Sequence, residues 1–244
     1  MKTAITGSGW VTPTTMGWGR NHDRFEWQKG ELPDITRKTV FEEPYPHFGR
    51  LDRYSRLGLS AISFALRDAG LNKWTRKRNI GIIASTLTGC LDTDIDYFDT
   101  VMIDGGRTAS PHLFAFTLPN SFLGEASIRF GLTGASFIIG EPSASSLWCL
   151  RMSLLGIAEG QFEKVVCGLC DLGSLPPYTE YHKRPCGALF FVFEKTPRHT
   201  QRVYGDLCLE ENGVLMFNNN EIKSLPVLAQ KCLSAFEAKD ELLP

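Results

Sequence analysis

Residues 134–160, near the middle of the chain, constrain its fold more than any other stretch. Residues 135–139 are apolar and partly β-branched, with a glycine on each side, which predicts a short strand. Pro142 suits the first turn of a helix, because its missing N–H would have no partner there. Residues 147–157 are apolar on nearly every face, which is typical of a helix buried on all sides. The stretch therefore predicts a tight strand-to-helix elbow.

The elbow carries a candidate nucleophile. Ser143 stands at the mouth of the predicted buried helix, where hydroxyl groups can also cap free backbone N–H groups. An elbow of this kind is where an acyl-transfer nucleophile is found. A serine hydroxyl is a weak nucleophile unless a base activates it, so the role of Ser143 depends on its neighbours.

The remainder of the chain alternates between strand and helix patterns. Residues 50–70 have helical spacing, with Gly70 as the expected stop, and residues 220–243 predict a closing helix that Pro226 delays. The glycine-rich segment after the first strand predicts a tight turn. Alternating strands and helices predict an open, mixed or parallel sheet with helices on its faces. Five segments have the apolar pattern of strands in this sheet: residues 2–5, 79–85, 135–139, 164–170 and 187–194. Residues 202–209 predict another strand.

Composition narrows the class of protein. The chain has 244 residues, 43% hydrophobic and 22% charged, as in an ordinary soluble globular protein. Its formal net charge of −1 gives no electrostatic basis for binding nucleic acid or an anionic membrane. No apolar run reaches the length of a membrane span, and no leader pattern opens the chain. Seven cysteines without framework spacing indicate a reducing compartment, so we expect a cytoplasmic protein.

Three clusters of reactive or charged residues are candidate metal, calcium or partner-binding sites. The C-x-x-C at Cys167 has no second pair and no histidine at metal spacing, which favours buried thiols, so no metal and no cofactor is expected. Four aspartates lack the glycine and terminal glutamate of a calcium loop, which favours a polar helix face. For three arginines, a solvated surface is favoured over a contact to an acidic carrier or partner. These two charged clusters are Asp92, Asp94, Asp96 and Asp99, and Arg50, Arg53 and Arg56.

Four segments carry a family resemblance. They are I-T-G-S-G-W-V-T-P at 5–13, R-L-D-R-Y-S-R-L-G-L-S-A at 50–61, S-P-H-L-F-A-F-T-L-P-N-S-F-L-G-E-A-S-I-R-F-G-L-T-G at 110–134, and the elbow. In this order they resemble the β-ketoacyl-acyl-carrier-protein synthases of the thiolase fold. The resemblance implies a thiolase-like half over residues 1–209: a mixed, mostly parallel five-stranded sheet with helices on both faces. Residues 210–244 are expected to form an extension, a hairpin and a helix, that packs on this half.

Two departures from the family bear on activity. Condensing enzymes of this family place a cysteine in T-A-C-S-S, whereas here the matching triplet is Glu141, Pro142 and Ser143. The family's two histidines and lysine lie in its C-terminal half, and no H-G-T-G-T-like segment occurs in this sequence. We therefore expect no catalytic residue in this chain. The alternative is a stand-alone acyltransferase or hydrolase that uses Ser143, and a third option is a homodimer that binds acyl carrier protein without tuning a product.

The resemblance also implies a partner. Some ketosynthases of the family work as heterodimers with a homologue that has lost the cysteine, the chain-length factor, which shapes the acyl tunnel. We expect this chain to pair in that way with a full-length β-ketoacyl synthase in fatty acid or polyketide biosynthesis, in particular of aryl polyenes, and to contact acyl carrier protein. The residues implied at the tunnel or interface are Ala109, His112, Phe114 and Phe116, and the strand residues Ala135, Ser136, Phe137, Ile138 and Ile139.

The helix after the elbow should also be affected by a missing half. In the family it is sandwiched between the two halves, so we expect Trp148, Leu150 and Leu154 to be uncovered unless the C-terminal tail or another protein covers them. Exposed apolar surface costs about 25 cal/mol per Å². We expect the C-terminal tail, residues 203–244, to cover this face of the helix.

Overall fold

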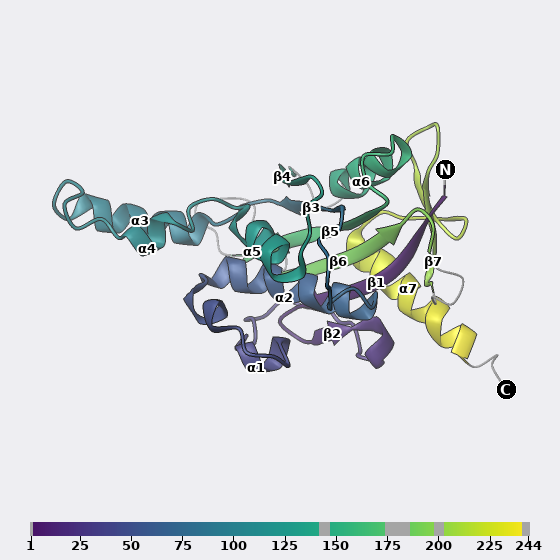
Figure 1. Cartoon of the computed structure of the whole chain (residues 1–244), viewed down its shortest axis with the longest axis horizontal. Helices are drawn as coiled ribbons and strands as arrows, with labels where there is room; N and C mark the ends of the chain where they lie inside the picture. The colour runs from purple at the N-terminus through teal and green to yellow at the C-terminus, as the bar shows by residue number, and fades with distance from the viewer. Residues whose placement is uncertain (1, 142–146, 174–185, 198–202, 241–244) are drawn as a thin grey trace.

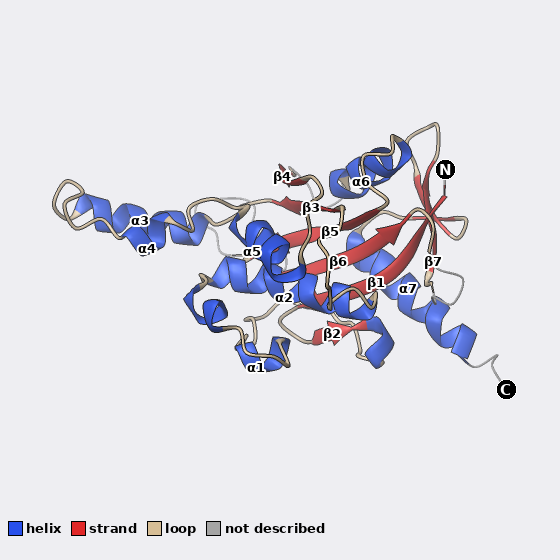
Figure 2. Cartoon of the chain, viewed as in Figure 1, coloured by secondary structure: helices blue, strands red, loops and turns tan. Residues whose placement is uncertain are grey.

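A computed structural model describes residues 2–141, 147–173, 186–197 and 203–240 of the chain, without the side chains of residues 237–240. A mixed sheet runs through the body of the protein (Figures 1 and 2), with strands in the order β4-β3-β5-β6-β1-β7-β8-β9 and β2 paired to β1. The strands are β1 (Lys2–Val11), β2 (Met16–Trp18), β3 (Ile80–Thr86), β4 (Ser136–Gly140), β5 (Lys164–Asp171), β6 (Gly187–Glu194), β7 (Gly205–Leu209), β8 (Leu215–Phe217) and β9 (Asn220–Glu221).

The five strands expected from the sequence form one contiguous part of this sheet, β4-β3-β5-β6-β1. The mixed α/β class is therefore confirmed. Parallel pairing is confined to β4-β3-β5, whereas β6 and β1 pair antiparallel to their neighbours, so the described sheet is less parallel than expected. Parallel neighbours need a crossover connection, such as residues 87–135 between β3 and β4, while antiparallel β7 and β8 are joined by a short turn.

Helices cover both faces of the sheet, as predicted. α2 (Arg53–Asp68) and α5 (Ser121–Phe130) belong to one core, and α6 (Trp148–Ala158) and α7 (Leu225–Asp240) to the other. The strand β6 shows the division, because Phe190 packs in the first core and Phe191 in the second, both fully buried. Three short helices complete the N-terminal region: η1 (Gly19–Asn21), α1 (Arg37–Val40) and η2 (Pro46–Arg50).

The first strand is longer than the sequence predicted, and the expected tight turn is wrong. β1 continues through Gly7 and Gly9 to Val11. A Cβ atom at Gly9 would lie 2.1 Å from the backbone nitrogen of Ala65, and one at Gly7 would lie 2.4 Å from the Ala65 carbonyl oxygen. These glycines therefore allow α2 to pack closely on the strand, which is a second use of glycine besides the turn.

The predicted helix at residues 50–70 is confirmed as α2. Asp52 caps its start, with its carboxylate accepting a hydrogen bond from the Ser55 backbone N–H at 2.9 Å. At the other end Gly70 has a φ of +68°, in the left-handed region, and the Leu71 N–H donates to the Leu66 carbonyl.

The helix after the elbow is not buried on all sides. One face of α6, with Leu150 and Leu154, is buried in the core that the sheet and the C-terminal segment share, so these two side chains are covered. The opposite face carries Trp148, Met152 and Leu155, which are 50%, 38% and 43% exposed. Their spacing places them on one stripe of the helix. An apolar helix therefore has one face that the described chain leaves in solvent.

The C-terminal segment extends the sheet and covers its α6-side core. β7 pairs with β1, and α7 begins at Leu225 with Pro226 in its first turn, as predicted. Phe236 packs against Tyr204, with ring centroids 5.5 Å apart. The hairpin turn contacts α6 at Arg151, whose guanidinium donates to the Gly213 carbonyl. The exposed stripe of α6 thus lies outside the cover that this segment supplies, and the domain division at residue 209 stays a prediction.

A buried carboxylate ties three distant segments together. Asp68, at the end of α2, accepts hydrogen bonds from the Ser8 N–H at 2.7 Å, the Arg20 N–H at 2.8 Å and the Tyr204 hydroxyl at 2.6 Å. Burial raises the pKa of the Asp68 carboxyl, and the bonds from Tyr204 and Arg20 oppose that rise. Asp68 therefore joins β1, η1 and the segment before β7 to α2.

We predict that Asp68→Ala lowers the free energy of unfolding by about 2–4 kcal/mol, because it leaves three buried donors without their acceptor. Urea denaturation at neutral pH followed by circular dichroism measures the change. Tyr204→Phe is the control, since it removes one of the three bonds and should cost only about 1 kcal/mol. Equal losses in the two variants would contradict a central role for Asp68.

Candidate functional site

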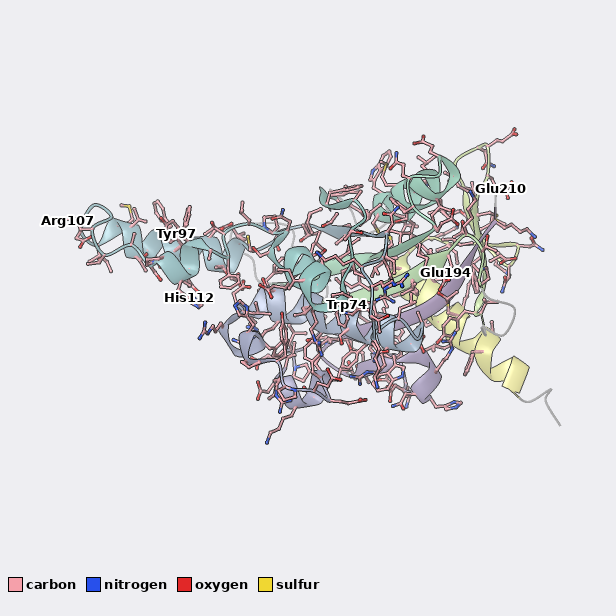
Figure 3. All side chains as sticks on the ribbon, in the orientation of Figure 1. Trp74, Tyr97, Arg107, His112, Glu194 and Glu210 are labelled. Carbon is pink, nitrogen blue, oxygen red and sulfur yellow. The ribbon has the colours of Figure 1, made fainter. Side chains whose placement is uncertain are left out.

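An arm projects from the body of the protein at the carboxyl end of β3 (Figure 1). It consists of residues 87–118 and contains α3 (Leu91–Met102) and α4 (Pro111–Phe114), which lie side by side. α3 confirms the helix predicted for the four aspartates. Figure 3 shows Tyr97 and His112 along the arm and Arg107 at its tip, far from Glu194 in the sheet. Four of the residues that sequence reasoning assigned to a tunnel or interface belong to this arm.

Two buried or partly buried carboxylates fix the root of the arm. Asp171, at the end of β5, accepts hydrogen bonds from the Leu87 N–H at 2.9 Å, the Thr88 N–H at 3.1 Å and the Thr86 hydroxyl at 2.8 Å. Asp52 accepts one from the Thr93 hydroxyl at 2.7 Å. The same carboxylate caps α2, so the direction of α3 is linked to the start of α2.

The two sides of the arm are packed against each other by few side chains. Tyr97 contacts Phe114, with ring centroids 5.5 Å apart, and the Ser110 N–H donates to the Thr100 hydroxyl at 3.1 Å. Much of the remaining apolar surface faces solvent. Half of the large apolar side chains that the described chain exposes lie on the arm: Ile95, Phe98, Met102, Ile103, Phe114 and Leu118.

A cavity of about 500 Å³ lies in the angle between the arm and the start of α2. His112 and Phe116 line it and contact each other, with ring centroids 5.4 Å apart. The three arginines noted in the sequence also line it, opposite aspartates of α3. The apolar and charged lining thus consists of Leu51, Ile95, Leu113 and Leu172, with Arg50, Arg53, Arg56, Asp52, Asp92 and Asp96.

The structure separates the predicted arm residues. His112 and Phe116 face the cavity, whereas Phe114 is 59% exposed and does not line it. Ala109 lies beside the tip of the arm, where its N–H donates to the Gly106 carbonyl, and it is partly buried. Their assignment to a tunnel or interface stays a prediction, and the geometry favours His112 and Phe116 as cavity residues.

The predicted strand residues lie at the edge of the sheet. β4 pairs in parallel with β3, and among the described residues its other edge has no partner strand. Ile138 packs toward the α2 core and Ile139 toward the α6 core, while Ala135, Ser136 and Phe137 are exposed. Gly140 is in register with Thr86, so β4 ends beside the root of the arm. An edge strand of this kind offers N–H and C=O groups to another chain.

Ser143 itself lies outside the described residues, which include Glu141 before it and α6 after it. Glu141 is 4% exposed, and its Oε1 atom accepts a hydrogen bond from the Cys149 N–H at 3.2 Å. A backbone N–H at the start of α6 is thus bonded to a carboxylate of the chain itself. Ser85 donates to the Cys149 sulfur at 3.5 Å. Sequence reasoning missed the buried position of Glu141, although a charged residue between a strand and an apolar helix was a signal.

The thiols and acids of the described residues suit structural roles. Cys167 and Cys170 are fully buried and free, which confirms the interpretation of the C-x-x-C as small buried thiols. Burial raises the pKa of the Cys90 thiol, at the root of the arm, to about 12. Within the described part of the chain, no group of three histidine, cysteine or acidic side chains could hold a metal ion. None of the described helices combines the length and apolar character of a membrane span.

Comparisons with known proteins agree with this geometry. A profile described as "Beta-ketoacyl synthase, N-terminal domain" matches residues 33–179. The curated "Putative polyketide beta-ketoacyl synthase 1" of Streptomyces virginiae is 26% identical over 159 residues, which cover 62% of this chain and 35% of that protein. The chain therefore spans about a third of the length of this relative.

Solved structures share the fold at low sequence identity. The ishigamide ketosynthase/chain length factor is similar with a TM-score of 0.64 and 15% identity, over 85% of this chain and 66% of that chain. A type II PKS acyl-carrier protein in complex with its ketosynthase bound to the hexaketide gives a TM-score of 0.66 and 17% identity, over 86% and 71% of the two chains. The predicted ketosynthase-like, thiolase-type fold is confirmed.

We predict that Asp171→Ala loosens the root of the arm. Its backbone and hydroxyl donors at residues 86–88 lose their acceptor, so amide hydrogen exchange over residues 87–93 should become about tenfold faster or more. Hydrogen–deuterium exchange with mass spectrometry measures this, with α2 peptides as an internal reference. Glu211→Ala, at an exposed position of the C-terminal hairpin, should leave exchange in the arm unchanged. Unchanged exchange in Asp171→Ala would show that other contacts hold the arm.

Proposed function

The chain belongs to the β-ketoacyl synthase family, of which it contains the N-terminal domain, and from this premise we propose that it is a non-catalytic, chain-length-factor-like subunit. In this proposal it forms a cytoplasmic heterodimer with an active β-ketoacyl-acyl-carrier-protein synthase and shapes the acyl tunnel of that partner. The product is a fatty acid or a polyketide, with aryl polyenes as the expected class.

The observation that carries the proposal is the arm. It presents large apolar side chains such as Phe98, Met102 and Ile103, which are 58%, 65% and 78% exposed. Surface of this kind marks an interaction site, and phenylalanine and methionine are enriched at interfaces. The arm leaves the body beside the free edge of β4, so a partner that contacts one can reach the other. The similar ishigamide structure is itself a ketosynthase/chain length factor.

The chemistry of the elbow supports a non-catalytic role. Ser143 stands where the family has its cysteine, and a hydroxyl is a far weaker nucleophile than a thiolate. The buried Glu141 carboxylate bonds an N–H at the start of α6, where a condensing enzyme would benefit from positive potential. The negative charge of Glu141 at this point would repel the negative charge that develops on a reacting oxygen or sulfur atom, so it disfavours that reaction.

Contact with an acyl carrier protein is part of the proposal. Arg50 and Arg53 are exposed at the cavity between the arm and α2. Carrier proteins with acidic surfaces would be attracted to such side chains. One of the similar structures contains an acyl-carrier protein with its ketosynthase.

The central test is co-expression with a tagged synthase from the same organism, followed by size-exclusion chromatography with light scattering. We expect a one-to-one complex that makes product from malonyl and acyl carrier thioesters. The chain alone should make none. Turnover by the isolated chain, or failure of every such synthase to bind, would end the proposal.

We predict that Ser143→Ala leaves product formation by this complex within about twofold of the wild type, since no covalent step uses that hydroxyl. Liquid chromatography with mass spectrometry quantifies the product. Loss of product, together with acylation of Ser143 in the wild-type protein, would instead support the stand-alone acyl-transfer or hydrolase function.

We predict that Phe116→Ala shifts the products toward longer chains, because it enlarges the cavity that Phe116 and His112 line. The product distribution of the reconstituted complex measures the shift. Leu209→Ala, a partly buried position on β7 at the other end of the sheet, is the matched control and should leave the distribution unchanged. An unchanged distribution in Phe116→Ala would favour a subunit that binds without tuning chain length.

A further inference from the structure

The helix α3 carries two parallel stripes of different chemistry, and the residues Asp92, Ile95 and Asp96 of these stripes also line the cavity beside α2. Leu91, Ile95, Phe98 and Met102 follow the spacing of one helix face. Asp92, Asp96 and Asp99 follow the neighbouring face with the same spacing. Within the apolar stripe, exposure is 41% at Ile95, 58% at Phe98 and 65% at Met102. The stripe therefore becomes more exposed toward the outer end of the helix.

The arm carries a net negative charge. Residues 87–118 contain five aspartates and Arg107 as their one lysine or arginine, a formal charge of −4 in a chain whose total is −1. Asp96 and Asp99 are exposed beside the apolar stripe. An apolar surface with an acidic border is complemented by an apolar hollow with a basic border.

In a second copy of this chain, the cavity beside the arm offers little of that complement. Its cations are Arg50, Arg53 and Arg56, and three aspartates line the same cavity as these three arginines. Two arms brought together about a two-fold axis would place acidic stripes near each other, which is unfavourable. The charge pattern therefore favours a different polypeptide over a two-fold dimer in which the arms meet.

We propose that α3 docks in an apolar hollow on the partner synthase whose border carries lysine or arginine side chains, and that this charge match selects the heterodimer over a homodimer. The inference rests on the proposed function and adds the chemistry of the partner surface. Phe98 and Met102 supply the buried apolar contact. Asp96 and Asp99 meet the basic border.

The test uses the full-length chain and the purified synthase that it accompanies, with dissociation constants from isothermal titration calorimetry at 50 and 500 mM NaCl. We expect Phe98→Ala with Met102→Ala to weaken binding about tenfold or more at both salt concentrations. Asp96→Lys with Asp99→Lys should weaken binding about tenfold at low salt and remove much of its salt dependence. The matched controls, Met216→Ala on β8 and Glu211→Lys in the hairpin, should bind like the wild type.

The outcomes separate the two proposals. If the wild type binds the synthase and the charge-reversal variant binds equally well at both salt concentrations, the inference is overturned while the proposed function stands. The wild-type chain could instead form a homodimer in the absence of the synthase. If the double substitution Phe98→Ala and Met102→Ala dissociates that homodimer, α3 binds a second copy of the chain, and the inference is again overturned. If the wild type binds no synthase, both proposals fail. Circular dichroism of each variant establishes that it is folded.

Discussion

The structure depends on burying the central strands of its sheet on both faces. β6 shows this most clearly, since all of its residues are buried and its side chains alternate between two cores. α2 can cover the first face because Gly7 and Gly9 of β1 let its backbone approach closely. α6 and α7 cover the second. The arm lies outside this two-sided core, and the arm, the outer edge of β4 and the exposed stripe of α6 leave apolar surface for another molecule.

Sequence patterns predicted the parts of the fold that depend on local chemistry. The five strands, α2 with its stop at Gly70 and the start of α7 follow from hydrophobic periodicity, glycine and proline. Local sequence patterns did not predict that Gly7 and Gly9 allow α2 to approach β1 closely. In a single sequence, a glycine at a turn cannot be distinguished from a glycine beneath a packed helix. Similarly, the apolar character of α6 predicted burial but not which face remains open.

In the candidate site too, some features follow from the sequence and others depend on tertiary structure. The arm residues were found through a family resemblance, and the structure then separated the cavity residues His112 and Phe116 from the exposed Phe114. The long-range bonds of Asp171 and Asp52 that fix the arm join segments far apart in the chain, so no local pattern indicates them. The stripes of α3 were present in the sequence as helical spacing. Their importance depends on the arm projecting from the body, which is a tertiary property.

The outer edge of β4 affects how readily this protein would aggregate in a cell. Among the residues that the structure describes, no strand pairs with the outer edge of β4, and an edge of this kind with Phe137 exposed is a template on which an extended chain can add a strand. If this chain is a subunit of the proposed heterodimer, a copy made in excess over the synthase would carry this template unprotected, together with the exposed stripe of α6. Balanced synthesis of the two polypeptides would then guard against insoluble deposits as well as supply a working complex.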